Sequence, residues 1–338
     1  MEKTEICDPF HLIQAKDQET NHDEFKESIS HNQDIIKENT WVSSLLYEIN
    51  GCWIPAKLVP AVTNFQNQFQ AKDSDIMLAT MPKSGTTWLK ALVFTITNRN
   101  LFQTLDQSPL LSSNPHALVP FFEYDIYPSS NTPLMNVDEI PSPRIFSTHI
   151  HFQCLPASVL DTKCRIIYIY RDPLDQFVSH WCFALENFYD GKTKPPIIEE
   201  ALEKYSKGIH PFGPFWDHML GYSKASSKDS NKVLFLKYEV LKADPVSVVK
   251  KIAEFLEIPF SPEEEINGMV EEVVKLCSFD NLKNLEVNRN GRTNYGVKHS
   301  SFFRKGGIGD WVNYVPPTMA ELVLNVMEEK LGGAGISF

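Results

Sequence analysis

Short apolar runs alternate with helix-like stretches along most of this chain. Three runs, at residues 76–79, 165–170 and 232–238, are short and almost continuously apolar. Stretches with helical character follow them at residues 91–96, 175–179 and 246–255. Short apolar runs are typical of strands buried on both faces. Their alternation with helices predicts an α/β fold with a central parallel sheet and helices on both faces.

The first 40 residues differ from the rest of the chain. They hold ten acidic residues against four lysines, a net charge of −6, and few large apolar side chains. Such a composition predicts a polar, acidic and mobile N-terminal segment over 1–40. Beyond it there is no repeat, low-complexity linker or sharp change in composition. We therefore expect one domain over residues 41–338, which begins with an aromatic-rich entry segment at 41–69.

Composition narrows the class of protein further. Of 338 residues 42% are hydrophobic, and the net charge is −11, which counts against a nucleic-acid partner. No apolar run approaches the ~18 residues of a membrane helix, and no apolar signal segment begins the chain. The six cysteines are scattered without a C-x-x-C pair. This pattern favours free thiols, a cytoplasmic location and no membrane partner.

The most informative stretch is residues 81–90, between the first apolar run and the helix that follows it. A helix N-terminus at this point would present free N–H groups and the positive end of its dipole to an anion. The turn adds a cationic side chain and several short polar donors: Lys83, Ser84, Gly85, Thr86 and Thr87. The pattern predicts a phosphate-binding loop.

This loop is not the G-x-x-x-x-G-K-[ST] loop of ATP- and GTP-binding proteins, because its lysine precedes its only glycine. Trp88 follows the two threonines at once, and its indole face could stack on a purine base. The alternative is an ordinary strand-to-helix turn with a polar cap and a tryptophan in the core.

Two further groups of basic residues could bind an anion. Arg171 follows the second apolar run, and Ser179 lies about two helical turns beyond it, so both could face one ligand. Arg304, Lys305 and Gly306 open a glycine-rich stretch whose backbone could approach an anion closely. A surface ion pair for Arg171 and a solvated turn for the glycine-rich stretch remain open.

His149 and His151 lie two residues apart, on one face of a predicted extended segment. A histidine can act as a general base near neutral pH, although a structural histidine is the more common case. We expect no metal site, because no third ligand stands at a characteristic spacing.

Five motifs in order resemble the cytosolic sulfotransferase family. They are P-K-S-G-T-T-W at 82–88, T-H at 148–149, R-D-P with a serine at 171–179, K-Y-E at 237–239 and F-R-K-G-x-x-G-D-W at 303–311. Three further stretches resemble the plant branch of that family: N-P-H at 114–116, G-P-F-W at 213–216 and L-C-S-F with L-E-V-N at 276–288. The resemblance runs from about Trp41 to the C-terminus.

The resemblance implies a donor, 3′-phosphoadenosine 5′-phosphosulfate (PAPS), and an acceptor hydroxyl on a small organic molecule, without a metal. It implies that Lys83 to Trp88 form a P-loop-like phosphosulfate-binding loop, with Trp88 stacked on adenine. It places Arg171, Ser179 and the Arg304, Lys305 and Gly306 triplet on the 3′-phosphate, and Tyr238 beside the adenine. His149 would accept the proton of the hydroxyl, and Lys83 would neutralise the leaving phosphate oxygen.

Two positions depart from the family pattern. Ser147 stands where animal members usually carry a lysine, two residues before the catalytic histidine. Pro316 and Pro317 replace the Thr-Val of the usual C-terminal dimer motif, of which only Glu321 is kept. We therefore expect a monomer.

The acceptors that the resemblance suggests are hydroxyjasmonates, flavonols, brassinosteroids and desulfoglucosinolates, with the first two favoured. Aromatic residues near the predicted site could line an apolar acceptor pocket, although plain core packing is the more common role for such residues. They are Phe121, Phe122, Tyr124, Phe152, Trp181, Phe183, Phe212 and Phe215. The alternatives to a sulfotransferase are a nucleotide-dependent small-molecule kinase and a diverged, non-catalytic nucleotide-binding homologue.

Overall fold

The computed structural model describes residues 36–41, 44–102, 104–127, 133–189, 191 and 196–338. Most of the predicted N-terminal segment, residues 1–35, lies outside the described residues. Residues 37–338 form one unit of the structure.

A four-stranded parallel sheet organises this unit. Its strands are β4 (Ile76–Thr80), β5 (Ile145–Thr148), β6 (Arg165–Tyr170) and β7 (Val233–Lys237), in the order β5-β4-β6-β7. The three apolar runs correspond to β4, β6 and β7. From β4 the chain first adds β5 on one side and then β6 on the other, so the connections change direction at β4. Ligands of open parallel sheets bind beyond the strand ends at such a point.

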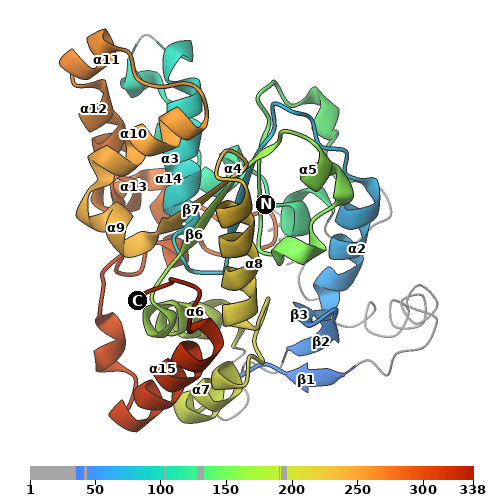
Figure 1. The fold of residues 1–338 in the computed structure, drawn as a ribbon. Coiled ribbons are helices and arrows are strands. Elements are labelled where there is room, and N and C mark those ends of the chain that lie inside the picture. Colours follow the sequence, from blue (N-terminus) through green and yellow to red (C-terminus); the bar gives the residue numbers. More distant parts are fainter. Residues whose placement is uncertain (1–35, 42–43, 103, 128–132, 190, 192–195) are drawn as a thin grey trace, which may run out of the picture. The chain divides into compact units, whose positions relative to one another are not determined.

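Helices cover both faces of the sheet, as predicted (Figure 1). On one face Leu78 and Ile167 join a buried apolar cluster with side chains of α3 (Thr86–Asn98) and α10 (Pro245–Phe255). On the other face Tyr168 stacks on Tyr222 of α8 (Phe215–Lys228), with ring centroids 4.3 Å apart. Since successive strand residues point to opposite faces, the neighbours Ile167 and Tyr168 serve the two layers.

A second, antiparallel sheet lies in the aromatic entry segment. Its strands are β1 (Lys37–Asn39), β2 (Leu45–Ile49) and β3 (Cys52–Pro55). The remaining helices are α2 (Val59–Gln68), α4 (Pro115–Leu118), α5 (Ala157–Asp161), α6 (Pro173–Phe188), α7 (Ile198–Ser206), α9 (Tyr238–Ala243), α11 (Pro262–Ile266), α12 (Met269–Leu276), α13 (Phe279–Asn284), α14 (Glu286–Asn290) and α15 (Pro317–Leu331). Within the described ranges no helix is long and apolar enough to cross a membrane.

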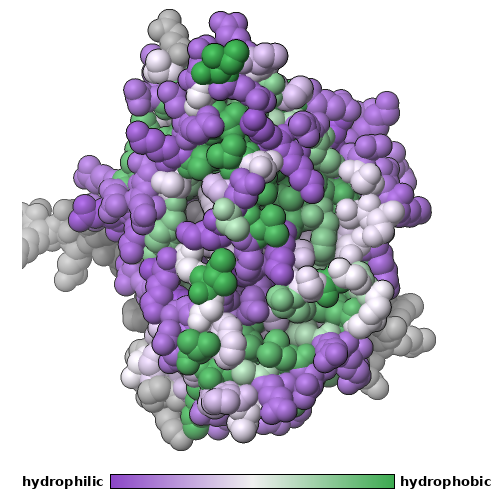
Figure 2. All heavy atoms as spheres, turned by 60° about the vertical axis from the view of Figure 1, so that its left-hand side comes forward, coloured by the Kyte–Doolittle hydropathy of each residue, from purple (hydrophilic) through white to green (hydrophobic). Residues whose placement is uncertain are grey.

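The face in Figure 2 is largely hydrophilic, with separate hydrophobic patches between the polar areas. Large apolar side chains exposed on this unit include Val240, Ile266 and Val312. Scattered exposed apolar residues of this kind are normal for folded proteins.

The carboxyl ends of the four parallel strands meet at one edge of the sheet. The loop that begins at Met81 follows β4, His149 follows β5, Arg171 follows β6 and Tyr238 follows β7. The parallel sheet therefore brings together residues that are far apart in the sequence.

A buried ion pair joins β4 and β5 at the opposite edge. Asp75 and Arg144 directly precede these strands, and both side chains are almost fully buried. Arg144 donates from Nε to Oδ1 of Asp75 at 2.8 Å and from Nη2 to Oδ2 at 2.6 Å. Two parallel hydrogen bonds of this kind fix the orientation of both groups as well as their charges.

Replacing Asp75 with asparagine should destabilise the fold by about 3–5 kcal/mol, because it leaves the buried Arg144 guanidinium with only the exposed Asp138 carboxylate, 3.3 Å away, as a counter-charge. Urea unfolding would measure the change. The matched control is Glu203→Gln, which breaks an exposed ion pair with Lys207 and should leave the unfolding midpoint almost unchanged. Equal unfolding midpoints for the two variants would contradict the role given to the buried pair.

Candidate active site

The turn between β4 and α3 has the geometry of an anion-binding loop. Lys83 and Gly85 both have positive φ, at 69° and 113°. A Cβ atom on residue 85 would lie 2.8 Å from Cδ2 of Tyr238, so glycine is required by backbone conformation and by space. Gly85 is the N-cap of α3 and supplies no side chain to satisfy the first N–H groups of the helix. These groups and the helix dipole therefore face the loop.

Lys83 is held in a site that disfavours its charge. Its Nζ donates to the carbonyl of Ser301 at 3.2 Å and lies 4.3 Å from the ring centroid of Phe183. The pKa of Lys83 is lowered to about 7. Burial is the main cause, and the nearby positive charges of Arg171 and Arg304 add to it. An anion bound here would offset this repulsion between cations.

Arg171 and Tyr238 hold the glycine-rich loop against the sheet edge. Arg171 donates from Nη2 to the carbonyl of Gly307 at 2.6 Å, and its guanidinium lies 4.7 Å from the ring centroid of Tyr238. The Tyr238 hydroxyl donates to the carbonyl of Gly306 at 3.0 Å. Ser179 lies buried on α6, the helix that follows Arg171. The three basic segments predicted from the sequence thus lie together.

Two aspartates that sequence reasoning missed organise the same loop. The buried carboxylate of Asp175 accepts from the backbone N–H of Gly309 at 2.7 Å and of Trp311 at 3.1 Å. Asp310 accepts from both Arg304 and Lys305 at 2.7 Å. Burial opposes ionisation of Asp310, but these hydrogen bonds hold its pKa at about 2. Asp175 stands two residues after the R-D-P triplet, and this position was the one feature of the sequence that could have pointed to it.

Several buried polar atoms of the predicted residues find no hydrogen-bond partner within the described part of the protein. They are Ser84 Oγ, Trp88 Nε1, Arg171 Nε and Arg304 Nε. Buried polar groups are nearly always hydrogen-bonded, so each of these atoms calls for a partner. All four can donate, and the phosphate and base acceptors of an adenine nucleotide are suitable partners. These residues therefore fit a bisphosphorylated nucleotide.

His149 directly follows β5 and faces the end of β4. Its Nδ1 lies 2.8 Å from the carbonyl oxygen of Thr80, which can only accept, so the proton is on Nδ1 and Nε2 is unprotonated. Burial lowers the pKa of His149 to about 3, which keeps the ring neutral. Aromatic rings surround it, with centroids at 4.6 Å for Phe121 and 5.4 Å for Phe212. The ring is an oriented, neutral acceptor between apolar walls.

A buried carboxylate fixes the backbone at this histidine. Glu123 Oε1 accepts from the N–H of His149 at 2.9 Å and also from the hydroxyl of Thr148. Burial raises the pKa of Glu123 to about 7. The sequence carried no signal for Glu123, because the contact joins segments that are far apart along the chain.

The side chain of His151 makes its hydrogen bonds away from Thr80, the partner of His149. The strand ends at Thr148, and Nε2 of His151 lies 2.9 Å from the carbonyl oxygen of Phe212 and 3.1 Å from that of Gly213. The two histidines therefore hydrogen-bond to different parts of the structure. Among the described residues there is no group of three histidine, cysteine or acidic side chains that could hold a metal ion.

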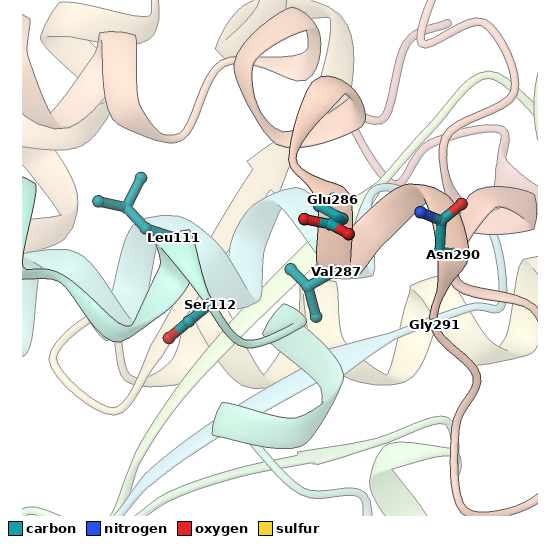
Figure 3. A pocket seen from close by; sticks show the side chains of 6 residues that line it. All are labelled: Leu111, Ser112, Glu286, Val287, Asn290 and Gly291. Carbon is teal, nitrogen blue, oxygen red and sulfur yellow. The ribbon is translucent and has the colours of Figure 1, made fainter.

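An open pocket of about 510 Å³ lies away from these groups, between residues 111–112 and α14 (Figure 3). The side chains that line it include Glu286 and Val287 but no cationic group. An anionic ligand would find no counter-charge there, unlike at the sheet edge.

The fold and this cationic edge define an enzyme that handles a nucleotide-linked anionic group. The sulfotransferase domain family matches residues 73–335 of the chain. The chain belongs to this family.

Its relatives in Arabidopsis thaliana include cytosolic sulfotransferase 15, which is 43% identical over 305 residues, or 89% of this chain and 84% of the relative. Cytosolic sulfotransferase 12 is 45% identical over 304 residues, or 89% and 91%. The chain is therefore a PAPS-dependent sulfotransferase, as predicted, and not a kinase. The names of these relatives also confirm the predicted cytosolic location.

Solved structures agree with this assignment. A crystal structure of an Arabidopsis thaliana sulphotransferase is 40% identical, with a TM-score of 0.74 over 95% of this chain and 97% of the other. A mouse sulfotransferase complexed with PAP, adenosine 3′,5′-bisphosphate, is 25% identical, with a TM-score of 0.66 over 85% and 94%.

Replacing Lys83 with methionine should stabilise the protein, and more so at low pH. The folded-state pKa of about 7 lies below the ~10.4 of an unfolded chain, so holding the charge costs stability below pH 7, and this cost fades towards pH 10. We expect the gain to be roughly 3 kcal/mol larger at pH 6 than at pH 9. Urea unfolding at both pH values measures it. The exposed Lys228→Met is the control, and a pH-independent gain in Lys83→Met would contradict the assignment.

Proposed function

We propose that this sulfotransferase transfers the sulfuryl group to a hydroxyl of a small organic acceptor with His149 as general base. The observation that carries the proposal is the hydrogen bond from Nδ1 of His149 to the Thr80 carbonyl at 2.8 Å. It leaves Nε2 as the proton acceptor at the end of β5, next to the loop that follows β4. A neutral imidazole is the protonation state that a general base needs.

We further propose that the residues of the sheet edge hold PAPS, which supplies the sulfuryl group when bound. Lys83, Ser84, Gly85, Thr86 and Thr87 would bind the 5′-phosphosulfate. Trp88 and Tyr238 would lie beside the adenine. Arg171, Ser179, Arg304, Lys305 and Gly306 would bind the 3′-phosphate. The unpartnered donors on four of these residues support this assignment. The relative that is complexed with PAP supports it as well.

In the proposed step the acceptor oxygen forms a bond to sulfur while the bond from sulfur to the phosphate oxygen breaks. Nε2 of His149 takes the hydroxyl proton, and the Lys83 ammonium offsets the charge that develops on the phosphate oxygen. Positioning and charge stabilisation dominate in transfers of this type. Binding of the anionic donor would favour the charged form of Lys83, which the free protein disfavours.

The surroundings of His149 favour an apolar acceptor. Its ring is surrounded by Phe121, Phe212 and Tyr124, and the Tyr124 ring lies 5.0 Å from that of Tyr295. Aromatic walls with one polar group at the reacting position suit a small hydroxylated molecule. Within this class we propose a plant hormone or secondary metabolite, with hydroxyjasmonates and flavonols ahead of brassinosteroids and desulfoglucosinolates. We also propose a monomeric enzyme without a nucleic-acid, membrane or metal partner.

His149→Ala should lower turnover by ~10²–10⁴-fold, because a general base contributes about that much. Its affinity for PAP should stay within about threefold, since a base on the acceptor side makes no contact with the product nucleotide. Steady-state kinetics on an acceptor that the wild type sulfates, together with calorimetric PAP titration, measures both quantities.

The matched variant is His151→Ala, which should keep substantial turnover. Thermal unfolding of both variants checks that each is folded. Loss of turnover in a folded His151→Ala with retention in His149→Ala would reassign the base.

A further inference from the structure

A chain of three side chains reaches the donor loop from the protein interior. Nε2 of His116 lies 2.9 Å from Oγ1 of Thr87, and Nδ1 of His116 lies 3.1 Å from Nζ of Lys90. Lys90 and His116 are buried, whereas Thr87 is partly exposed and is the second residue of α3. The chain therefore connects a buried amine with a hydroxyl of the anion-binding loop.

The surroundings of Lys90 fit a charged ammonium group. Nζ donates to the carbonyl of Val119 at 2.7 Å, faces Nδ1 of His116 and lies 3.4 Å from the ring centroid of Phe121. An ammonium has three N–H donors. The Val119 carbonyl, the His116 nitrogen and the Phe121 ring face are three possible partners for them. Burial lowers the pKa of Lys90 well below its ordinary value, and the negative charges of Asp125 and Glu123 offset only part of that shift.

The charge on Lys90 decides which nitrogen of His116 carries the proton. The Phe121 ring face at 3.4 Å favours the ammonium form of Lys90. In that form Lys90 can only donate, so Nδ1 of His116 accepts and Nε2 holds the proton. Nε2 then donates to Oγ1 of Thr87. The hydroxyl proton of Thr87 is left free to be donated in another direction. With the opposite tautomer, the Thr87 hydroxyl would donate its proton to Nε2 of His116 instead.

We propose that Lys90 and His116 are positioning residues that make the Thr87 hydroxyl a hydrogen-bond donor to the 5′-phosphate end of the bound nucleotide. This inference rests on the proposed function, which puts that end of the donor in the loop. Neither residue touches the nucleotide. They act through Thr87: its hydroxyl oxygen accepts from His116, so its proton can be donated to the nucleotide.

Two of the motifs found in the sequence hold this chain in place. Asn114 accepts from the backbone N–H of His116 through Oδ1 at 2.9 Å and donates from Nδ2 to Oδ1 of Asn288 at 2.8 Å. Asn288 in turn donates to the carbonyl of Leu282 at 2.8 Å. The N-P-H triplet at 114–116 and the end of the L-E-V-N stretch therefore meet directly. Phe302 packs on the His116 ring, with centroids 4.1 Å apart.

A double-mutant cycle measured by calorimetric titration with PAP tests the coupling. Thr87→Val removes the hydroxyl at constant shape and should weaken PAP about tenfold, the usual effect of a hydrogen bond to a charged group. Lys90→Met should weaken PAP by a similar factor. The double variant should be no weaker than Thr87→Val alone, because Lys90 acts only through Thr87. Losses that multiply in the double variant would overturn the proposal.

Two substitutions of His116 distinguish the role of Nε2 from that of Nδ1. Glutamine can place an amide N–H near the position of Nε2, so His116→Gln should bind PAP within about threefold of the wild type. Asparagine reaches only the position of Nδ1, so His116→Asn should lose about as much as Thr87→Val. Equal losses in two folded variants would contradict the proposal.

The wild-type protein provides a test that does not depend on the folding of any variant. ¹⁵N NMR of the His116 imidazole should show the proton on Nε2, and a proton on Nδ1 alone would overturn the inference. If the wild type does not bind PAP at all, the proposed donor site is wrong. The tautomer measurement then still decides the state of the chain.

Discussion

The hydrogen bond from His149 to the Thr80 carbonyl joins the two halves of this active site. Thr80 is the last residue of β4, directly before the donor loop, and His149 directly follows β5. One contact thus sets the tautomer of the proposed base and fixes its place relative to the loop. It depends on β4 and β5 being parallel neighbours, which the buried ion pair at the opposite edge supports.

Local charge, not net charge, is the basis of the anion binding that we propose for this edge. The chain as a whole carries −11, yet Lys83, Arg171 and Arg304 lie close enough for the two arginines to lower the pKa of the lysine. Asp310 pairs with Arg304 and Lys305 at 2.7 Å, and Asp175 lies 3.7 Å from Arg171, so these carboxylates hold the loop and offset part of its positive charge. Lys83 has no such carboxylate partner among the described residues, and the proposed donor would supply an anionic one. The same logic applies to Lys90, whose charge would act at a distance by setting the tautomer of His116.

The sequence allowed β4, β6, β7 and α10 to be predicted because each has a continuous apolar or periodic pattern. β5 was not predicted as a strand, because half of its four residues are polar although all are buried; only an extended segment around His149 was expected. The antiparallel sheet was also missed, although Asn50 and Gly51 between β2 and β3 are a common hairpin turn pair and both have positive φ. The loop residues followed from local motifs. Glu123 and the link from Asn114 to Asn288 could not be found this way, since they depend on contacts between distant segments.

The most direct test of the account is thermal stability with adenosine 3′,5′-bisphosphate against ATP with Mg²⁺, each at the same excess. A ligand at ~100 times its dissociation constant adds about 2.7 kcal/mol to the free energy of unfolding. The account predicts stabilisation by the bisphosphate alone, and its loss in Arg171→Ala and Arg304→Ala. Stabilisation by ATP with Mg²⁺ alone, or an undiminished shift in both arginine variants, would contradict it.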